Sequence, residues 1–221
     1  MKDFEQVLRE RRSVRGYLPT PVVPEKLKAI FQMAQLAPSN CNTQPWSVFV
    51  ASGAKRDEIR QKLVEKAVKG APPEPSVDMV QKYEGSYRQR QMDCAVALYS
   101  TVGVERNDKE GRARVALRNF ELFDAPHAAF VCMPSEFTAY NAMDVGIYVQ
   151  TLMLCMQYHG VSSCAQGALT LYPKVLQEAF GFDDSLCVLV GLSFGYEDTS
   201  VIANRARIGR AELIESVTFA G

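Results

Sequence analysis

The most apolar stretch of the sequence, residues 142–156, limits the folds that the chain can adopt. Only Asp144 and Gln150 interrupt it. A membrane-spanning helix needs about 20 consecutive apolar residues with few charges, so this stretch does not predict a membrane span. A helix that is apolar on nearly all sides belongs in a protein interior. We therefore predict a buried helix over residues 141–159, central to the core.

Shorter apolar runs at 47–51, 128–133 and 186–194 predict buried strands, because they are brief and bounded by turn-forming residues. Helical patterns are interleaved with them: one begins at the N-cap Asp3 and runs out at RRSVRG, and the others cover 24–37, 54–68, 78–104 and 173–181, with a last weak pattern at 211–217. No repeat or low-complexity tract interrupts the 221 residues. We expect a single domain over 1–221.

The overall charge gives no reason to expect a nucleic-acid or membrane partner. Twenty-five basic residues balance 25 acidic residues, so the molecule has no net field that would attract either polyanion. The N-terminus, MKDFEQVLRERR, is charged throughout and lacks the apolar segment of a secretory signal. The six cysteines are scattered without a CxxC pair, and the two histidines are isolated. We expect a reduced, cytoplasmic protein without a metal site.

The first group of candidate functional residues is Arg11-Arg12-Ser13-Val14-Arg15, where the first helix ends. Guanidinium groups bind phosphate or carboxylate through two parallel hydrogen bonds, so three of them beside a hydroxyl favour an anion site. The alternative is a solvated basic helix end that is stabilised by the helix dipole.

The second group is APSNCNTQPW, residues 37–46, between a helix and a strand. Its amide and hydroxyl side chains supply both donors and acceptors, which suits the edge of a heteroaromatic ring or a polyol. The alternative is an ordinary turn whose side chains cap backbone groups, although such a turn needs fewer polar residues.

Two further groups lie in the second half of the chain. Residues 160–168, GVSSCAQGA, are small enough for a backbone to approach a flat ligand, or else form a tight loop around a buried cysteine. Arg205 and Arg207 point the same way if the backbone is extended, and could meet Arg11 and Arg15 around one phosphate. An exposed basic tail is the alternative. Rossmann, P-loop and GxSxG hydrolase motifs are absent.

Taken in order, these segments resemble the nitroreductase family of FMN-dependent oxidoreductases. The matching motifs are RRSVRGY, APSNCNTQPW, FELFDAP at 120–126, DVGIYVQ at 144–150, SCAQG at 163–167 and RAR at 205–207. They span nearly the whole chain in the order of the family pattern. The resemblance implies an α+β fold with a central mixed, mostly antiparallel sheet surrounded by helices. It also implies an interlocked homodimer with FMN sites at the interface.

The resemblance also assigns roles to individual residues. Arg11, Ser13, Arg205 and Arg207 would hold the phosphate and ribityl end of FMN, with Arg12 in the same motif, and Arg15 would reach the pyrimidine side. The dimethylbenzene and ribityl region of the flavin would be lined from the partner subunit by Pro38, Ser39, Asn40 and Asn42. Gln44 would support either that loop or the flavin edge. The backbone N–H groups of Gln166 and Gly167 would face flavin N5. Phe120 or Phe123 would cover a substrate, or else pack in the core.

The function that the resemblance implies is ping-pong hydride transfer from NADPH or NADH, through FMN, to a small-molecule acceptor such as a nitroaromatic or a quinone. No side chain is nominated as catalytic. The alternatives are a flavoenzyme of the same fold with dehydrogenase, reductive dehalogenase or flavin-modifying chemistry, and a non-enzymatic flavin-binding protein. Cys164 stands where the family often has proline, and segment 70–92 matches no motif.

Overall fold

A four-stranded antiparallel sheet forms the centre of the molecule. The computed structural model describes residues 3–79 and 82–221. The strands are β1 (Ser47–Ser52), β2 (His127–Pro134), β3 (Ser162–Gln166) and β4 (Leu186–Gly195), in the order β1-β2-β4-β3. A single parallel bridge joins Ser13 to Ser163 at the edge of β3. The expected α+β fold with a mostly antiparallel sheet is confirmed.

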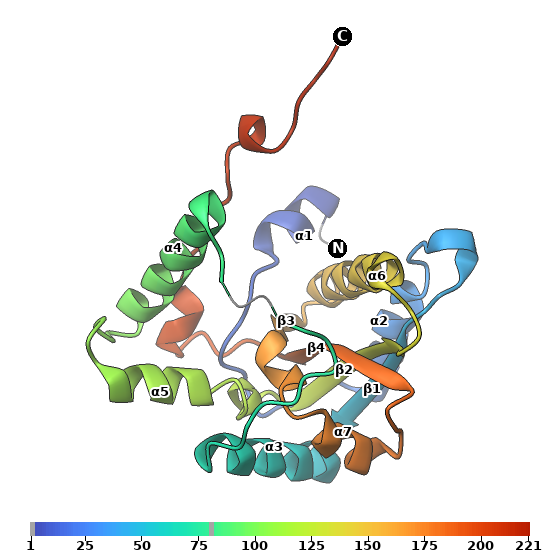
Figure 1. The fold of residues 1–221 in the computed structure, drawn as a ribbon, viewed down its shortest axis with the longest axis horizontal. Coiled ribbons are helices and arrows are strands. Elements are labelled where there is room, and N and C mark those ends of the chain that lie inside the picture. Colours follow the sequence, from blue (N-terminus) through green and yellow to red (C-terminus); the bar gives the residue numbers. More distant parts are fainter. Residues whose placement is uncertain (1–2, 80–81) are drawn as a thin grey trace.

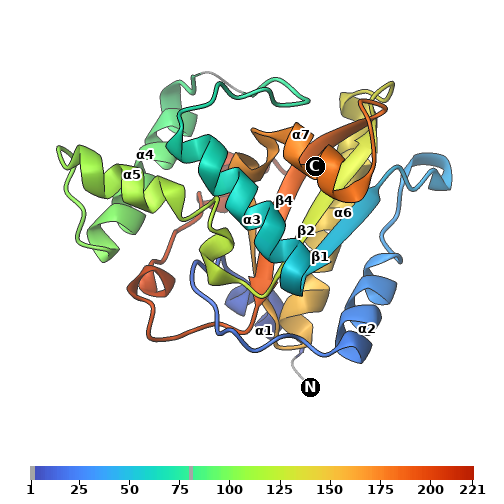
Figure 2. The ribbon, with the colours of Figure 1, turned by 90° about the horizontal axis from the view of Figure 1, so that it is seen from below.

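Helices cover both faces of this sheet (Figures 1 and 2). They are α1 (Phe4–Glu10), α2 (Pro24–Ala34), α3 (Gly53–Val68), α4 (Gly85–Thr101), α5 (Lys109–Leu117), α6 (Ala139–Tyr158) and α7 (Pro173–Phe180). The long apolar helix α6 packs with α2 on one face, and α3 packs with α7 on the other. The prediction of a central buried helix is confirmed.

Strand β2 separates two hydrophobic clusters because successive side chains point to opposite faces of a sheet. Ala129, Val131 and Met133 pack on the α6 side, while Ala128 and Phe130 pack on the α3 side. Every one of these five side chains is buried. A strand covered on both faces has no polar alternation, which is why its sequence reads as a continuous apolar run.

The local start and stop signals of the first and last helices are confirmed. The Asp3 carboxylate accepts a hydrogen bond from Gln6 N at 2.8 Å, although the Gln6 amide donates to Glu10, so only half of a capping box forms. Helix α7 begins at Pro173 and ends before Gly181, whose φ of 73° is the left-handed conformation that favours glycine.

Other sequence predictions are corrected. Residues 162–166, expected in a loop, form strand β3, and 211–217 contain only a short 3-10 turn at Leu213–Glu215. Helix α4 starts at Gly85 instead of residue 78, and α5 follows it as a separate helix that the sequence pattern did not reveal.

In the described ranges, no helix is long and apolar enough to cross a membrane. The same residues contain no group of three or more His, Cys, Asp or Glu side chains arranged to hold a metal ion.

His127, the first residue of β2, joins the segment before α2 to the sheet. Val22 N donates to its Nε2 at 2.8 Å, so Nε2 carries the lone pair and Nδ1 carries the proton. Nδ1 then donates to the Ser52 hydroxyl, 2.5 Å away. Burial, with a further contribution from Arg56, lowers the pKa of His127 below its ordinary value. The imidazole is therefore held neutral, and a second ring proton would break the contact with Val22.

This contact predicts destabilisation in acid. Because the pKa of His127 is lower in the folded state, its stabilising contribution is complete above the unfolded-state pKa of 6.5 and declines as the pH falls through the folded-state value. Replacing His127→Phe should lower the free energy of unfolding at pH 7.5 by roughly 1–3 kcal/mol, because Val22 N–H loses its acceptor. Urea denaturation at pH 7.5, 6.5 and 5.5 measures both effects. The variant should show a smaller loss of stability on acidification, and equal slopes for both proteins would contradict this role.

Candidate functional site

A positively charged cavity of about 1050 Å³ lies between the end of α1 and the C-terminal segment. This volume is at the upper end of the range for small-molecule sites. Its lining includes six arginines and two glutamates, namely Arg9, Glu10, Arg11, Arg12, Arg15, Glu197, Arg207 and Arg210. Ser13, Gly160, Ser162 and Ala206 also contribute. Two of the predicted groups, RRSVR and the RAR segment, are thus brought together.

A buried asparagine joins these two segments. Asn204 Oδ1 accepts from Arg15 N at 2.6 Å, and its Nδ2 donates to the carbonyls of Gly16 and Asp198 at 2.9 and 2.8 Å. The approach is close: a Cβ added to Gly16 would lie 2.5 Å from the side chain of Val201. Only glycine therefore fits where the tail crosses residue 16.

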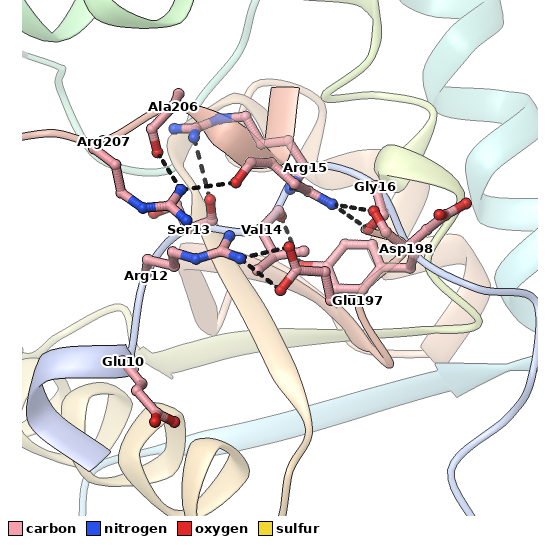
Figure 3. A network of polar contacts seen from close by, with 12 residues as sticks. Glu10, Arg12, Ser13, Val14, Arg15, Gly16, Glu197, Asp198, Ala206 and Arg207 are labelled. Atoms are coloured by element: carbon pink, nitrogen blue, oxygen red, sulfur yellow. Dashed lines mark hydrogen bonds and ion pairs between the residues drawn. The ribbon is translucent and has the colours of Figure 1, made fainter. Parts of the chain in front are cut away.

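Arg12 forms an ion pair with the carboxylate of Glu197. Its Nη2 donates to both oxygens of Glu197, at 2.5 and 2.6 Å, and Figure 3 shows the two side chains pointing toward each other. Arg12 Nη1 is buried and has no hydrogen-bond partner within the described structure. The pair ties the RRSVR segment to the end of β4 and neutralises one of the cavity's guanidinium groups.

Arg9 is also paired with a carboxylate, that of Glu5, at 2.7 Å. Arg15 and Arg207 have neutral partners within the described ranges. Arg15 Nη1 donates to the Ser13 carbonyl at 3.3 Å, and Arg207 Nη1 donates to the carbonyls of Asn204 and Ala206 at 2.9 and 3.0 Å (Figure 3). Across residues 3–79 and 82–221, no ion pair to a carboxylate is formed by these two or by Arg11 and Arg210. Cations gathered without counter-charge predispose the cavity to bind an anion.

The excess of positive charge affects the pKa of Arg11. Its pKa is lowered, first by burial and then by the nearby guanidinium of Arg210. A bound anion would remove the repulsion, because an opposite charge favours the charged form of both groups.

The RRSVR segment lies alongside the edge of strand β3. Val14 N donates to the Ser163 carbonyl at 3.2 Å, which holds residues 13–14 alongside the strand. Cys164 is buried with Val14, Tyr17 and Phe123, and burial raises the pKa of its thiol. Cys164 therefore sits in a paired strand and packs as a small apolar residue.

The loop at residues 38–46 lies apart from the cavity, beyond one end of α6 (Figure 1). Cys41, Asn42 and Gln44 have φ values of 48°, 56° and 47°, a left-handed conformation that is unusual for residues other than glycine. Asn40 N donates to both carboxylate oxygens of Asp144 at 3.2 Å. Ser39 Oγ accepts from Gln44 N at 2.9 Å. The backbone of the loop is thereby fixed.

The side chains of this loop face outward. Pro38, Asn40, Asn42 and Gln44 are exposed, and Ser39 is partly exposed. At its end, Trp46 is buried and stacks on Tyr148 with ring centroids 4.7 Å apart, while its Nε1 donates to Gln35 at 3.1 Å. The loop is therefore a firmly anchored projection, and its residues are not among those that line the arginine-rich cavity.

Gln166 and Gly167 lie at the far end of β3 and do not line the cavity. The Gln166 side chain is buried, donates to the Asn119 carbonyl at 3.0 Å and accepts from the Ser193 hydroxyl. This amide holds the start of the turn after β3 in place.

Three further predicted residues also lie outside the cavity lining. Arg205 ends the 3-10 turn Ile202–Arg205 and is exposed, so the expectation of an extended backbone through it is wrong. Phe123 is buried in the core, where its left-handed φ of 53° turns the chain inward, and Phe120 packs on Tyr172. A role for Phe123 over a substrate is corrected to core packing.

Sequence reasoning missed Glu197 and Arg210 as parts of the site, and it assigned no role to Asn204, although Asn204 directly precedes the RAR segment. Asn204 and Arg210 flank the RAR segment, so the local density of polar residues was a usable signal for both. Nothing near Glu197 in the sequence marks it as the partner of Arg12, 185 residues away.

Comparison with known proteins agrees with this fold. The model of the Nitroreductase family matches residues 8–196. The chain is 36% identical to nitroreductase NfnB of Mycolicibacterium smegmatis over 97% of this chain and 92% of the relative. It is 33% identical to a 4-nitrobenzoate reductase of Pseudomonas putida, over 94% and 91%. The crystal structure of the FMN-dependent nitroreductase NfnB from Mycobacterium smegmatis in complex with NADPH superposes with a TM-score of 0.95 at 35% identity, covering 98% of this chain and 97% of that one. The resemblance seen in the motifs is thus confirmed over almost the whole chain, and the protein belongs to the nitroreductase family.

Proposed function

We propose that the protein is an FMN-dependent oxidoreductase that uses NADPH or NADH to reduce nitroaromatic, quinone or similar electron-poor acceptors. Its similarity to NfnB, which is described as FMN-dependent and in complex with NADPH, supports the cofactor and the electron donor. Similarity to a 4-nitrobenzoate reductase supports a nitroaromatic acceptor. One FMN-binding domain over 1–221 is part of this proposal, as is a cytoplasmic location, which cysteines placed within apolar runs favour.

The uncompensated guanidinium groups of the cavity carry the proposal. A phosphate monoester has a charge between about −1.5 and −2 at pH 7 and three strong acceptor oxygens. Arg11 and Arg207, with the hydroxyl of Ser13, offer donors of the right kind and lack carboxylate partners. Arg15 adds a further positive charge beside them. The donor set therefore fits the anionic end of FMN.

FMN, when bound, supplies the hydride chemistry, so the protein's task is to bind, orient and surround it. The chain's own residues hold an anion at the RRSVR segment and keep that segment rigid through Asn204 and Ser163. Arg15 favours negative charge on whatever lies beside it. No side-chain nucleophile or general base is needed for this role, and we nominate none.

Exposed apolar side chains support a homodimer. Tyr140, Met143 and Ile147 share one face of α6 and are 59%, 58% and 40% exposed. The C-terminal tail extends away from the body in Figure 1, and its Ile214 and Phe219 are 87% and 84% exposed. Apolar surface of this kind is buried in stable oligomers.

The dimer gives the outward-facing loop a function. We propose that Pro38, Ser39, Asn40, Asn42 and Gln44 line the FMN bound by the other subunit, since their side chains are exposed on a fixed backbone. Gln166 and Gly167 remain our proposal for the backbone donors that face flavin N5.

The function is tested by anaerobic reduction of the purified protein with NADPH and with NADH, followed by re-oxidation with a panel of acceptors. We expect a yellow protein whose flavin absorbance bleaches with at least one nicotinamide and returns with a nitroaromatic or a quinone. A flavin that neither nicotinamide reduces would contradict the oxidoreductase function and favour a flavin-binding protein. Re-oxidation by oxygen alone would contradict the acceptor class.

The phosphate assignment is tested by Arg11→Ala and Arg207→Ala. Each change removes a charge-assisted contact and should weaken FMN binding by roughly 1.5–3 kcal/mol. The ratio of flavin to protein absorbance after dilution and ultrafiltration measures the retained FMN. Lys55→Ala, far from the cavity in the first turn of α3, is the control for loss of positive charge. Unchanged flavin content in both arginine variants would contradict the assignment.

The shared site is tested by mixing variants. Asn42→Ala should loosen FMN without lowering the unfolding temperature, because its side chain is exposed. When Arg11→Ala and Asn42→Ala subunits are unfolded and refolded together, half of a random mixture is heterodimer, and each heterodimer has one intact site. FMN capacity should then recover to about a quarter of the wild-type sites. No recovery, in material that light scattering shows to be dimeric, would mean that each site is built by one subunit.

A further inference from the structure

Arg210 lies outside both arginine motifs but inside the cavity. It follows Arg207 by three residues in the tail and lines the same space as Arg11 and Ser13. Arg205, which the family pattern favours, is exposed like Arg207 and Arg210 but is not among the residues that line that space. The cavity therefore has a guanidinium group, that of Arg210, which the arginine motifs did not predict.

Arg210 lies near another guanidinium group and has no carboxylate partner among the described residues. Among the described residues, Arg210 Nη1 donates to the carbonyls of Ile208 and Gly209, at 3.1 and 2.9 Å, so its acceptors there are neutral. It is close enough to Arg11 for its charge to lower the pKa of that group. Two like charges held together in a cavity cost free energy until an anion lies between them.

The two glutamates of the cavity are engaged elsewhere. Both oxygens of Glu197 accept from Arg12. Glu10 accepts from the amides of Gln6 and Gln157, at 2.7 and 3.3 Å. Within the described ranges, neither carboxylate forms an ion pair with Arg11 or Arg210. Because Arg12 Nη2 already donates to Glu197, the Arg12 guanidinium cannot offer both of its terminal nitrogens to a ligand.

We propose that Arg210 is a further ligand of the FMN phosphate and forms with Arg11 a two-guanidinium clamp around it. The inference rests on the proposed function, because it assigns the anion as the phosphate of FMN. Two planar forks match the several oxygens of a phosphate monoester better than two lysines would. Arg12 then acts as a positioning residue that fixes the segment through Glu197.

The clamp is tested by comparing FMN with riboflavin, which has the same ring system but no phosphate. Equilibrium dissociation constants are measured by flavin fluorescence with wild type, Arg210→Gln and Arg210→Lys. Arg210→Gln should weaken FMN binding about tenfold or more, because a charge-assisted contact is lost, while riboflavin binding stays the same. Arg210→Lys should recover part of the preference for FMN. Arg114→Gln, on the exposed side of α5 and outside the cavity, is the control for a change of net charge.

Two outcomes would overturn the clamp. One is an unchanged preference for FMN over riboflavin in Arg210→Gln, above all if Arg205→Gln loses that preference instead. The other is an equal loss of FMN and riboflavin binding, which would mean that Arg210 supports the packing of the tail. Failure of the proposed function gives different results. If FMN is not the cofactor, wild type itself binds neither flavin; if FMN binds but no nicotinamide reduces it, the oxidoreductase function fails while the preference of wild type and Arg210→Gln for FMN over riboflavin still tests the clamp.

Discussion

The candidate site depends on one buried asparagine more than on any arginine. Asn204 satisfies three backbone groups, the N–H of Arg15 and the carbonyls of Gly16 and Asp198, and is only 3% exposed. These bonds hold together segments that are almost the whole chain apart. Without them, the N–H of Arg15 would lose its acceptor, while the carbonyls of Gly16 and Asp198 would each keep one backbone donor. The two arginine-bearing segments would then be held together more weakly against the repulsion of their charges. The positive cavity is thus assembled by an uncharged side chain.

Local sequence predicts those parts of the fold in which the residue pattern matches the burial that the tertiary structure imposes. The strands β1, β2 and β4 and the helix α6 could be predicted because most of the residues that the structure buries in them are apolar. The polar exceptions are His127, Asp144 and Ser193. Strand β3 could not, because SSCAQ has little strand signal of its own and is extended through its pairing with β4. Within the site, the arginine-rich segments were predictable. Which arginines face the cavity was not, because a 3-10 turn at residues 202–205 sets the direction of each side chain.

Backbone conformation explains why the side-chain directions at Phe123 and in the loop at 38–46 could not be predicted from the sequence. Leu122, Phe123 and Asp124 all have left-handed φ values, and this turn buries an aromatic ring that composition alone would allow to face a ligand. The loop at 38–46 uses the same conformation at three residues and is held by Asp144 and Trp46. Left-handed residues other than glycine cost free energy in the folded protein. Because the fold meets that cost, the loop presents its side chains in a fixed arrangement before any ligand arrives.

The contrast between a neutral molecule and its positive cavity has a kinetic consequence. With 25 basic and 25 acidic residues, the protein has little long-range field, so ligand capture is governed by the local field of the arginines around the cavity. Low-dielectric walls focus that field and raise the encounter rate of small anions, an effect that falls steeply with ionic strength because the Debye length is only about 8 Å in physiological salt. An anionic flavin therefore gains speed of association from the same groups that retain it, whereas an uncharged aromatic acceptor arrives by unguided diffusion.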